Sequence, residues 1–556
     1  MYKPKSFEVL GNLSAYFKKG YWSKDVIAGI IVAVIALPLS IALAISSGVS
    51  PEKGLITAII AGFCISFFGG SDVQIGGPTG AFVVIICGII GQYGLEGLII
   101  ATLMAGVFLI LFGLLKLGNI IKYIPYTITV GFTTGIAVTL FSTQINDLFG
   151  LGIENVPSEF FAKWGTYFSH FSNTNLYALL IGLITIVISF VWPKINKKIP
   201  GSLIALIVTT ALVMIFKMPV DTIGSCFGEI SNKIPMPKLY AVDFNTIIKL
   251  LSPAFTIAIL AAIESLLSAV VADGMTGKKH DSNAELIGQG IANIASSLFG
   301  GIPATGAIAR TAANIKNGGR TPIAGIVHAV TLLVIMLVLM PFAKLIPMAT
   351  LAGILAVVSY NMAELKSMKM LLKSTKSDAT VMMVTFILTV VFDLVVAIEI
   401  GMIIAMALII KKLSENTTVK PVDYPEEEPT TDLEKYKNDR IMVYEINGPL
   451  FFGAASTFLD TLNDINTKIH IVIFDMSKVT VLDATAYDAL AKIEKRCRVS
   501  HILPLFAGVC EQPMKIMANF GKLEGINKDM FFDNIEVAYK EAENIVTIYH
   551  NTKKRR

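Results

Sequence analysis

Residues 67–81 read FFGGSDVQIGGPTGA, and residues 298–307 read LFGGIPATGA. Each stretch follows a short apolar segment and opens another, so one glycine- and proline-interrupted pattern occurs twice in the chain. Short, interrupted segments at corresponding positions of two halves are typical of inverted-topology repeats, where they indicate a binding site near the middle of the membrane. The two stretches therefore predict a repeated membrane fold.

Fourteen apolar runs surround and include these stretches. They span residues 26–46, 54–68, 80–91, 95–115, 127–148, 176–192, 203–216, 253–272, 284–299, 305–315, 323–340, 350–358, 379–392 and 394–410. A membrane-spanning helix needs about 20 apolar residues, or fewer where it is broken inside the protein. The two stretches open the third and tenth runs, and because seven is odd the two halves have opposite orientations. We expect an α-helical polytopic membrane protein with 14 segments arranged as a 7+7 inverted repeat.

The overall composition argues against a soluble enzyme. Of the 556 residues, 54% are hydrophobic and only 16% are charged, with a mean hydropathy of +0.67. A net charge of +5 gives no support for a nucleic-acid partner. The sequence contains no recognisable nucleophile–base pair or metal-ligand cluster, so no enzyme activity is expected. Lysine and arginine concentrate in the loops on the side of the N-terminus, which predicts a multi-pass cell-membrane protein with both termini in the cytoplasm.

The distribution of charge divides the chain into five parts. They are a cytoplasmic N-terminal segment at 1–24, a transmembrane domain at 25–413, a proline- and glutamate-rich linker at 414–438, a small α/β domain at 439–550 and a basic tail at 551–556. In the α/β domain, apolar strand-like runs alternate with helical patterns, which favours a sheet covered by helices. The basic tail is expected to face solvent or anionic lipid headgroups.

The chemistry of the two repeated turns favours anion binding. In each turn, proline and small residues precede a helix, whose N-terminus carries about half a positive charge and free amide groups. Two such ends, brought together by the repeat, would form an anion site from backbone alone. Arg310 lies about one helical turn beyond Thr305, where a cation usually faces a cavity or a partner. The alternatives are kinked helices in a tight bundle, with Arg310 in a structural salt bridge or reaching the membrane surface.

An acidic residue, Glu264, lies in the middle of the eighth run. Ser265 adjoins it, and Ser268 lies one turn further along the same face. A carboxylate at this depth suits proton carriage, or Na⁺ coordination together with a hydroxyl and backbone oxygens. The alternative is a carboxyl group bonded to a neighbouring helix. His328, a lone histidine in an apolar run, is expected to be packed rather than functional.

These motifs resemble the sulfate permease (SulP) family of anion transporters. The resemblance rests on QIGGPT at 74–79, on GGIP at 300–303 with Arg310, and on GGRTP at 318–322. The C-terminal part resembles a STAS domain, most clearly in NGPLFF at 447–452 and VLD at 481–483. Together, the two resemblances cover nearly the whole chain.

The resemblance implies 7+7 inverted helices whose core and gate parts move in an elevator-like manner, usually in a homodimer within membrane lipid. It implies secondary active transport of a small anion, namely a dicarboxylate, bicarbonate or sulfate, with no cofactor other than H⁺ or Na⁺ as a coupling ion. An anion exchanger or channel of the same fold, and a nucleobase permease, are the alternatives. The motifs around Glu264 and Arg310 are similar to those of bacterial dicarboxylate transporters of the family.

The resemblance also assigns residues to the site. The implied substrate-binding residues are Thr79, Gly80 and Ala81 of the third helix with Thr305, Gly306, Ala307 and Arg310 of the tenth. Glu264 and Ser268 match the positions that bind Na⁺ in cyanobacterial bicarbonate transporters of the family.

Two places depart from the family pattern. Many sulfate transporters have Pro-Gln in the first helix with a tyrosine after it, whereas Leu39 follows Pro38 here and Leu43 stands near the tyrosine position. This departure weakens the case for sulfate. In related STAS domains a phosphoacceptor serine follows the aspartate, whereas alanine follows Asp483 here and Thr485 carries the next hydroxyl. Asp483 and Thr485 are therefore the candidate regulatory residues.

Overall fold

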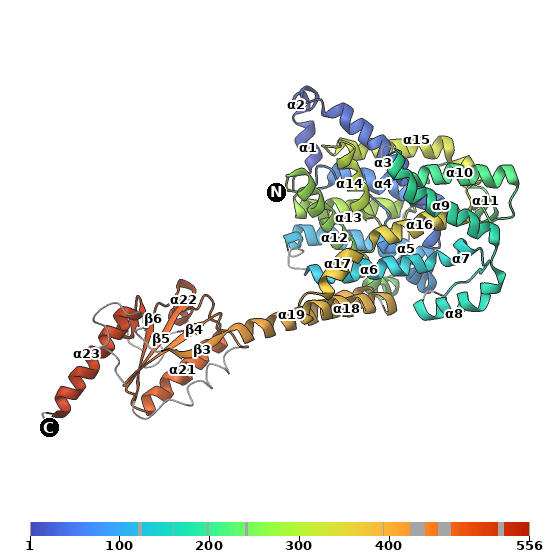
Figure 1. The fold of residues 1–556 in the computed structure, drawn as a ribbon. Helices are drawn as coiled ribbons and strands as arrows, with labels where there is room; N and C mark the ends of the chain where they lie inside the picture. The colour runs from blue at the N-terminus through green and yellow to red at the C-terminus, as the bar shows by residue number, and fades with distance from the viewer. Residues whose placement is uncertain are drawn as a thin grey trace. The chain divides into compact units, whose positions relative to one another are not determined.

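The computed structural model describes residues 2–119, 125–157, 159–196, 199–238, 243–392, 394–422, 440–453, 469–520 and 528–554. Backbone contacts divide the chain into two compact units, Met1–Met402 and Ile403–Arg556, and Figure 1 identifies their elements. The division falls within helix α19 (Leu394–Asn416), which also contains the predicted domain boundary at residues 413 and 414.

The first unit is built almost entirely from helices. They are α1 (Lys5–Leu10), α2 (Leu13–Lys18), α3 (Tyr21–Ser46), α4 (Pro51–Phe68), α5 (Ala81–Leu114), α6 (Tyr126–Thr143), α7 (Ile145–Phe149), α8 (Phe160–His170), α9 (Leu176–Ile195), α10 (Gly201–Phe216), α11 (Ile223–Phe227), α12 (Phe244–Thr276), α13 (Ser282–Leu298), α14 (Ile308–Lys316), α15 (Ile323–Ala343), α16 (Met348–Met362), α17 (Leu365–Leu372), α18 (Lys376–Val391) and the first part of α19. Among the described residues, eight helices are long and apolar enough to cross a membrane, judged by length and composition. Each of the fourteen predicted runs lies largely within one or two of these helices, although the tenth run begins in the short strand β2 (Thr305–Gly306).

One long helix contains two of the predicted runs. Helix α5 covers both 80–91 and 95–115, but Gly94 interrupts it with φ 70° and ψ −177°, a conformation that only glycine adopts easily. The interruption divides α5 into two helical segments, so the third and fourth runs remain separate elements. In the same way, the fifth run is divided between α6 and α7.

Helices from the first half of the repeat pack against helices from the second half. The second half of the repeat supplies α12 and α13, which pack against α5 of the first half, and α15 of the second half packs against α3 and α4 of the first. Neither half therefore buries its own helices alone. Helices α5 and α13 approach so closely that a Cβ on Gly106 would lie 2.7 Å from the carbonyl oxygen of Gly290. Small residues at such crossings are typical of helix packing in membranes.

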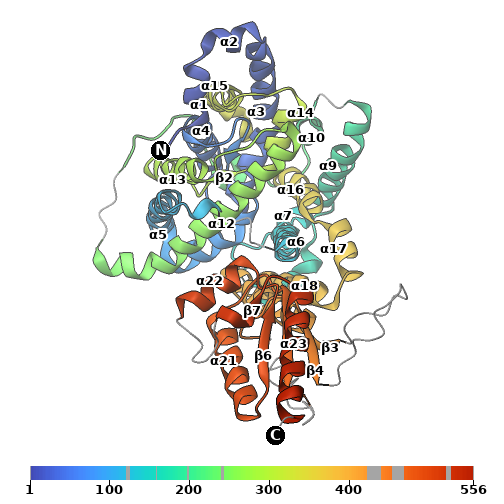
Figure 2. The ribbon, with the colours of Figure 1, turned by 90° about the vertical axis from the view of Figure 1, so that its left-hand side faces the viewer.

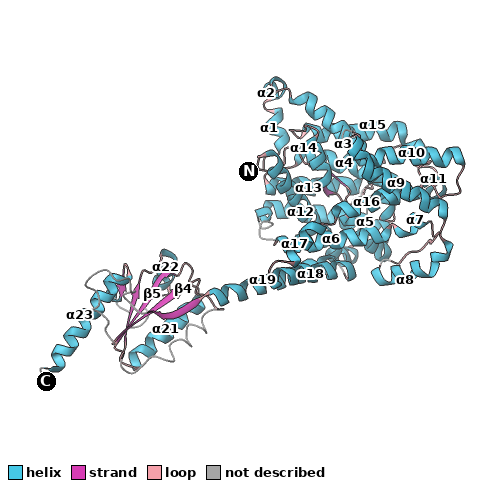
Figure 3. Ribbon diagram, in the orientation of Figure 1, coloured by secondary structure: helices cyan, strands magenta, loops and turns pink. Residues whose placement is uncertain are grey.

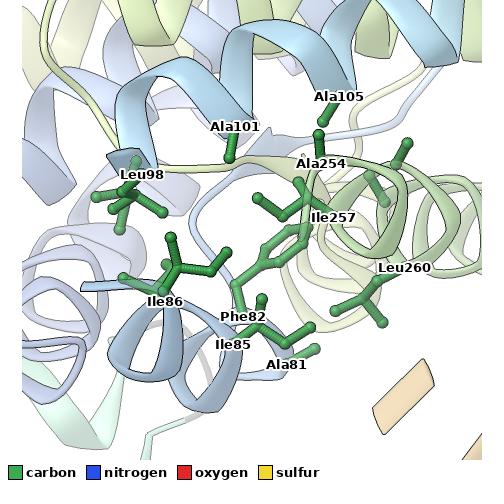
Figure 4. Close-up of a cluster of buried hydrophobic side chains, with 14 of the residues drawn as sticks. Ala81, Phe82, Ile85, Ile86, Leu98, Ala101, Ala105, Ala254, Ile257 and Leu260 are labelled. Atoms are coloured by element: carbon green, nitrogen blue, oxygen red, sulfur yellow. The ribbon is translucent and has the colours of Figure 1, made fainter. Parts of the chain in front are cut away.

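A large apolar cluster lies behind the start of α5. Figure 4 shows Phe82 and Ile85 of α5 facing Ala254 and Ile257 of α12, with Ala101 of the second α5 segment nearby. All of these side chains are buried. Because a buried aromatic side chain contributes several kcal/mol of packing energy, this cluster fixes the position of the α5 N-terminus relative to α12.

The second unit contains a five-stranded sheet with the order β3-β4-β5-β6-β7. Its strands are β3 (Thr418–Val422), β4 (Ile441–Asn447), β5 (Ile471–Lys478), β6 (Leu503–Ala507) and β7 (Phe531–Phe532); β3 pairs antiparallel with β4, and the other pairs are parallel. Helices α21 (Ala484–Val499) and α23 (Ile535–Lys554) pack on opposite faces, and α22 (Glu511–Asn519) contacts α21. Strand β5 alternates accordingly, since Phe474 faces α21 and Ile473 faces α23. Strand β3 lies in the segment that the sequence assigns to the linker.

Candidate anion site between two helix N-termini

The two repeated turns meet in a short strand pair. Strand β1 (Gly76–Gly77) pairs antiparallel with β2 (Thr305–Gly306), so that Gly76 lies opposite Gly306 and Gly77 opposite Thr305. Figure 3 shows strand colour among the helices at this point, and Figure 2 shows β2 between α4 and α12, both of which contact it. Helix α5 begins at Ala81 and α14 at Ile308, directly beyond the two strands. The repeat therefore brings both predicted helix N-termini to one place.

The amide groups at these two helix starts are available. Within the described residues, the amides of Gly80 and Ala81 in the first turn, and of Ile308 and Ala309 in the second, have no hydrogen-bond acceptor. Ile308 is 37% exposed. The first turn of a helix leaves several amides unpaired, because no earlier turn supplies carbonyl acceptors for them, and together with the helix dipole these amides attract anions. The arrangement is suited to holding a small anion.

Side chains of two flanking helices, α6 and α16, limit the space beside the first turn. A Cβ on Gly80 would lie 2.7 Å from Cδ2 of Leu140 in α6 and 3.3 Å from Sδ of Met362 in α16. The neighbouring Ala81 is buried, as are Gly306 and Ala307 of the second turn, and Thr305 is fully buried. Glycine and alanine therefore leave room at the helix starts, and apolar side chains limit that room.

Arg310 supplies a fixed positive charge at this junction. Its side chain is only 3% exposed; Nη2 donates a hydrogen bond to the carbonyl oxygen of Pro78, and Nη1 has no partner among the described residues. None of the described carboxylates forms an ion pair with it. A buried cation without a counter-charge is costly, so this position favours the arrival of an anion. The alternative that Arg310 forms a structural salt bridge is therefore not supported in the described part of the chain.

His328 of α15 is fully buried, in keeping with the prediction that it is packed. Both ring nitrogens lack a hydrogen-bond partner among the described side chains and backbone groups. A Cβ on Gly62 would lie 3.9 Å from the Cδ2 atom of His328 and 3.2 Å from the carbonyl oxygen of Gly76, so the imidazole lies close to β1.

Glu264 lies beside the first turn. The carboxylate is 8% exposed and forms no ion pair within the described chain, and the Thr79 hydroxyl lies next to it without a hydrogen bond of good geometry. A carboxylate and a neighbouring free hydroxyl are oxygen ligands that suit a small hard cation. These residues therefore fit the Na⁺ or H⁺ that the resemblance implies.

Ser268 is engaged elsewhere. Its hydroxyl donates to the Thr311 hydroxyl of α14 (3.2 Å), which in turn accepts a hydrogen bond from the amide of Ile75 (3.1 Å). Ser268 thus belongs to a chain of hydrogen bonds that reaches the first turn through α14. Its place on the same helix face as Glu264 was predicted, but this partner was not.

Sequence reasoning missed the residues that hold the first turn. The buried Glu285 of α13 accepts hydrogen bonds from the amides of Gly70 (2.8 Å) and Ser71 (3.1 Å), and from the hydroxyl of Ser265 (3.1 Å). Gln74 donates from Nε2 to the carbonyl oxygen of Ser265 (3.1 Å) and to its hydroxyl (2.9 Å). The first turn is therefore supported by polar side chains from α12 and α13.

The second turn is held mainly by neutral side chains, and Nζ of Lys53 in α4 donates a hydrogen bond to the carbonyl oxygen of Gly300 (3.1 Å). Asn293 of α13 donates to the carbonyl oxygen of Ala304 and accepts from its amide, both at 2.9 Å. Ser296 donates to the carbonyl oxygen of Ile302 (2.8 Å), and Thr57 of α4 accepts from the amide of the same residue (2.8 Å).

One sequence signal could have revealed part of this support. The polar residues of α13 that face the turns recur at helical spacing, at Glu285, Gln289, Asn293 and Ser296. All four are fully buried.

The N-terminal helices border a separate cavity. Helices α1 and α2 and the loops near Asp72, Lys278 and Thr321 line a space of about 460 Å³ that includes none of the predicted site residues. Lys278 forms an ion pair with Asp72 at 3.0 Å.

The residues before α1 contact the end of α4. Burial raises the pKa of Tyr2 to about 12, and the Tyr2 hydroxyl donates a hydrogen bond to the carbonyl oxygen of Phe68. This segment therefore packs against the end of α4.

In the second unit, Asp483 caps helix α21. Its carboxylate accepts hydrogen bonds from the amides of Ala486 (2.8 Å) and Phe452 (3.0 Å), and so joins the helix to the preceding loop. Thr485 lies exposed in the first turn of α21. The aspartate has a structural partner, and the threonine hydroxyl faces solvent.

Comparison with known proteins agrees with this architecture. Residues 22–385 match the model of the sulfate permease family, and residues 432–538 match the STAS domain. The chain is 44% identical to YvdB of Bacillus subtilis, a protein provisionally named a sulfate transporter, over 93% of this chain and 98% of the relative. It is 33% identical to the bicarbonate transporter BicA of Picosynechococcus over 84% of this chain and 85% of BicA.

Solved structures give the same result. The transmembrane domain of a cyanobacterial BicA superposes with a TM-score of 0.62 at 33% identity, covering 69% of this chain and 97% of that domain. SLC26A9 superposes with a TM-score of 0.86 over 98% of this chain and 93% of its own, and at 19% identity this likeness concerns the fold alone.

These matches confirm the predicted fold class, a polytopic helical membrane protein with a small α/β STAS domain. The family consists of transporters rather than enzymes, as expected. The nucleobase-permease alternative loses its support for the same reason. With its paired helix N-termini, its buried arginine and its C-terminal STAS domain, this chain belongs to the sulfate permease family.

Proposed function

We propose that this protein is a secondary active transporter of small oxyanions, which bind between the N-termini of α5 and α14. The observation that carries the proposal is Arg310, a buried guanidinium without a carboxylate partner among the described residues, at the junction of two helix starts. The backbone amides of both turns and the free Nη1 of Arg310 would neutralise and orient the anion. Thr79, Gly80 and Ala81 on one side, and Thr305, Gly306 and Ala307 on the other, would form the walls.

The close packing beside Gly80 favours compact anions. Leu140 and Met362 lie so close to Gly80 that a long substrate would meet them. Bicarbonate and sulfate fit this restriction better than a dicarboxylate does, and relatives of this chain are named bicarbonate and sulfate transporters. We therefore place bicarbonate and sulfate first and a dicarboxylate such as fumarate third.

Transport is proposed to be coupled to Na⁺ or H⁺ through Glu264. An anion that enters beside a buried carboxylate meets repulsion unless a cation neutralises the carboxylate. Na⁺ would be held by Glu264 with the Thr79 hydroxyl, and a proton would be held by Glu264 alone. Cation binding therefore favours anion binding, and the two are carried together. An exchanger or a channel of the same fold would not require this step.

The remaining features of the proposal concern the assembly. We propose elevator-like alternating access, a homodimer in the cell membrane, and cytoplasmic N- and C-termini. The enrichment of lysine and arginine in the loops on the N-terminal side supports this orientation.

The test is uptake of radiolabelled bicarbonate, sulfate and fumarate into proteoliposomes, with imposed Na⁺ or proton gradients. We expect one of the two gradients to drive accumulation of bicarbonate or sulfate. Glu264→Gln should abolish the dependence on the gradient, whereas Glu399→Gln, an exposed acidic residue of α19, serves as a matched control and should not. Equal gradient dependence in wild type and Glu264→Gln would remove Glu264 from the mechanism, and no uptake of any of the three anions would refute the proposed function.

For the STAS domain, we propose that phosphorylation of Thr485 regulates transport. A phosphate in the first turn of α21 would be stabilised by the helix N-terminus, so the modification need not unfold the domain. Asp483 would keep the acceptor in place as the helix cap. The comparison of Thr485→Asp with Thr485→Ala in the uptake assay tests this idea: different rates support it, and equal rates contradict it.

A further inference from the structure

Helix α12 is tied to both repeated turns on one face. Thr305 of the second turn donates from its hydroxyl to the carbonyl oxygen of Ala261 (2.9 Å). Gln74 of the first turn donates to the carbonyl oxygen (3.1 Å) and the hydroxyl (2.9 Å) of Ser265. Residues four apart lie on the same helix face, so the two turns are attached one helical turn apart.

A third hydrogen-bonded contact lies further along the same face of α12. Ser268, three residues beyond Ser265, donates to Thr311 of α14, which accepts from the amide of Ile75. Glu264 lies beside this row and takes part in none of its hydrogen bonds. The proposed cation ligand therefore sits on the helix that holds both halves of the proposed anion site.

Gln74 occupies the central position among these ties. Its side chain is buried and crosses directly over Gly306 of the second turn, where a Cβ would overlap the amide nitrogen of Gln74. The orientation of the amide is fixed, because the carbonyl oxygen of Ser265 can only accept a hydrogen bond and must face the NH₂ group. Gln74 thus contacts α12 and β2 while it belongs to the first turn.

We infer that Gln74 is a positioning residue that transmits cation occupancy at Glu264 to the paired turns that bind the anion. The inference rests on the proposed function and adds the route of coupling to it. When a cation binds beside Ser265, any shift of α12 moves Gln74, and Gln74 moves against Gly306. Because coupling between two binding sites is reciprocal, anion binding strengthens cation binding through the same residue.

The network is well suited to this role because its side chains are buried and joined to one another by hydrogen bonds. Ser265 also donates to Glu285 (3.1 Å), whose carboxylate holds the amides of Gly70 and Ser71. Buried hydrogen-bonded groups have few alternative arrangements, so a displacement at one end is passed on rather than absorbed. Apolar packing alone would leave the turns freer to shift independently of α12.

The experiment measures coupling rather than activity. Binding of sulfate and of bicarbonate to the purified full-length protein in nanodiscs is titrated by calorimetry with and without saturating Na⁺, and binding of sulfate alone is also titrated at low and high pH. The ratio of the two dissociation constants is the coupling factor. For wild type we expect a factor of about 10, within the usual range for coupled sites.

Three variants separate coupling from stability. Gln74→Met keeps the side-chain volume and removes the amide, so the coupling factor should fall to within about twofold of one, while the anion affinity without cation changes less than about threefold. Ser265→Ala keeps the backbone acceptor and should give an intermediate factor. Ser296→Ala is the matched control. It removes a buried hydrogen bond that holds the second turn, but this bond comes from α13 and not from α12. It should lower the melting temperature and leave the coupling factor unchanged.

The outcomes are distinct. A wild-type coupling factor in Gln74→Met overturns the inference. An equal loss of coupling in Ser296→Ala also overturns it, because the hydrogen bonds to α12 would then only stabilise the structure. If the wild type binds anions without any effect of Na⁺ or pH, this inference fails together with cation coupling, and anion binding stands. If the wild type binds neither probe, the proposed function itself fails.

Discussion

The first and second turns share a sequence pattern but differ in the charge that surrounds them. The first turn is supported from behind by the carboxylate of Glu285, which holds the amides of Gly70 and Ser71. The second turn is supported chiefly by the neutral side chain of Asn293, accepts a hydrogen bond from the cation Lys53 at Gly300, and is followed by the cation Arg310. The pseudo-symmetry of the repeat brings the two helix starts together. The charged residues near them, Glu285 and Arg310, do not follow that symmetry.

This difference assigns separate tasks to the two turns. Arg310 extends from the second turn to the carbonyl oxygen of Pro78 in the first, so its positive charge lies between the two halves of the repeat. Glu264 faces Thr79 of the first turn. We therefore expect substitutions after the second turn to change anion affinity, and substitutions behind the first turn to change stability and cation dependence.

The largest effect should come from removal of the charge on the second turn. Arg310→Met is expected to weaken sulfate or bicarbonate binding by about 100-fold or more, because removal of a buried charge partner costs about 2–5 kcal/mol. Calorimetric titration of the purified protein measures this loss. Arg310→Lys keeps the charge but not the planar donor set, and should recover part of the affinity; if both variants bind like wild type, the asymmetry of the turns has no role in recognition.

The support of the two turns can be compared directly. Glu285→Gln should destabilise the protein by about 3 kcal/mol, because two backbone amides lose a charged acceptor, whereas Asn293→Ala should cost about 2 kcal/mol. Thermal unfolding in detergent, followed by intrinsic fluorescence, gives the order of the two melting temperatures. A higher melting temperature for Glu285→Gln than for Asn293→Ala would reverse the comparison.

A smaller effect is expected where the two turns touch. In Gly306→Ala the new methyl group must displace Gln74 from Ser265, at a cost of about 1–3 kcal/mol. Gly88→Ala is a matched control in α5, because nothing lies within 4 Å of its Cβ position. The melting temperature of Gly88→Ala should equal or exceed that of wild type. Equal melting temperatures for both variants would mean that Gln74 does not hold the contact described here.

The smallest effect should come from the support of the second turn by α4. Thr57→Val removes the acceptor for the amide of Ile302 but keeps the side-chain shape, and should cost about 1 kcal/mol. Amide hydrogen exchange of the full chain should show faster exchange at Ile302, with no change at Gly70. Faster exchange at both residues would indicate that the two turns share one support.

The sequence predicts the features that are coded locally. The paired turns, the fourteen segments and the burial of Glu264 follow from apolar runs and from motifs that can be read without knowledge of distant contacts. The sequence indicates Arg310 in the same way, because a cation in an apolar helix is conspicuous.

What the sequence could not predict depends on distant partners. Gln74 and Glu285 bond to groups about 200 residues away in the chain or on a different element, and periodicity specifies a helix face but not the neighbour of that face. Ser268 illustrates the point, since its face was predicted and its partner Thr311 was not. Strand β3 was missed because Pro421 and the acidic residues after it resemble a linker.

The exchange of support between the halves has a consequence for biosynthesis. When the ribosome has completed only the first half, the amides of Gly70 and Ser71 have no acceptor, because Glu285 has not yet been made. The nascent turn must then remain hydrated or shielded by the insertion machinery until α12 and α13 enter the bilayer. Two fragments separated between the halves should consequently become functional only when both are produced in the same cell.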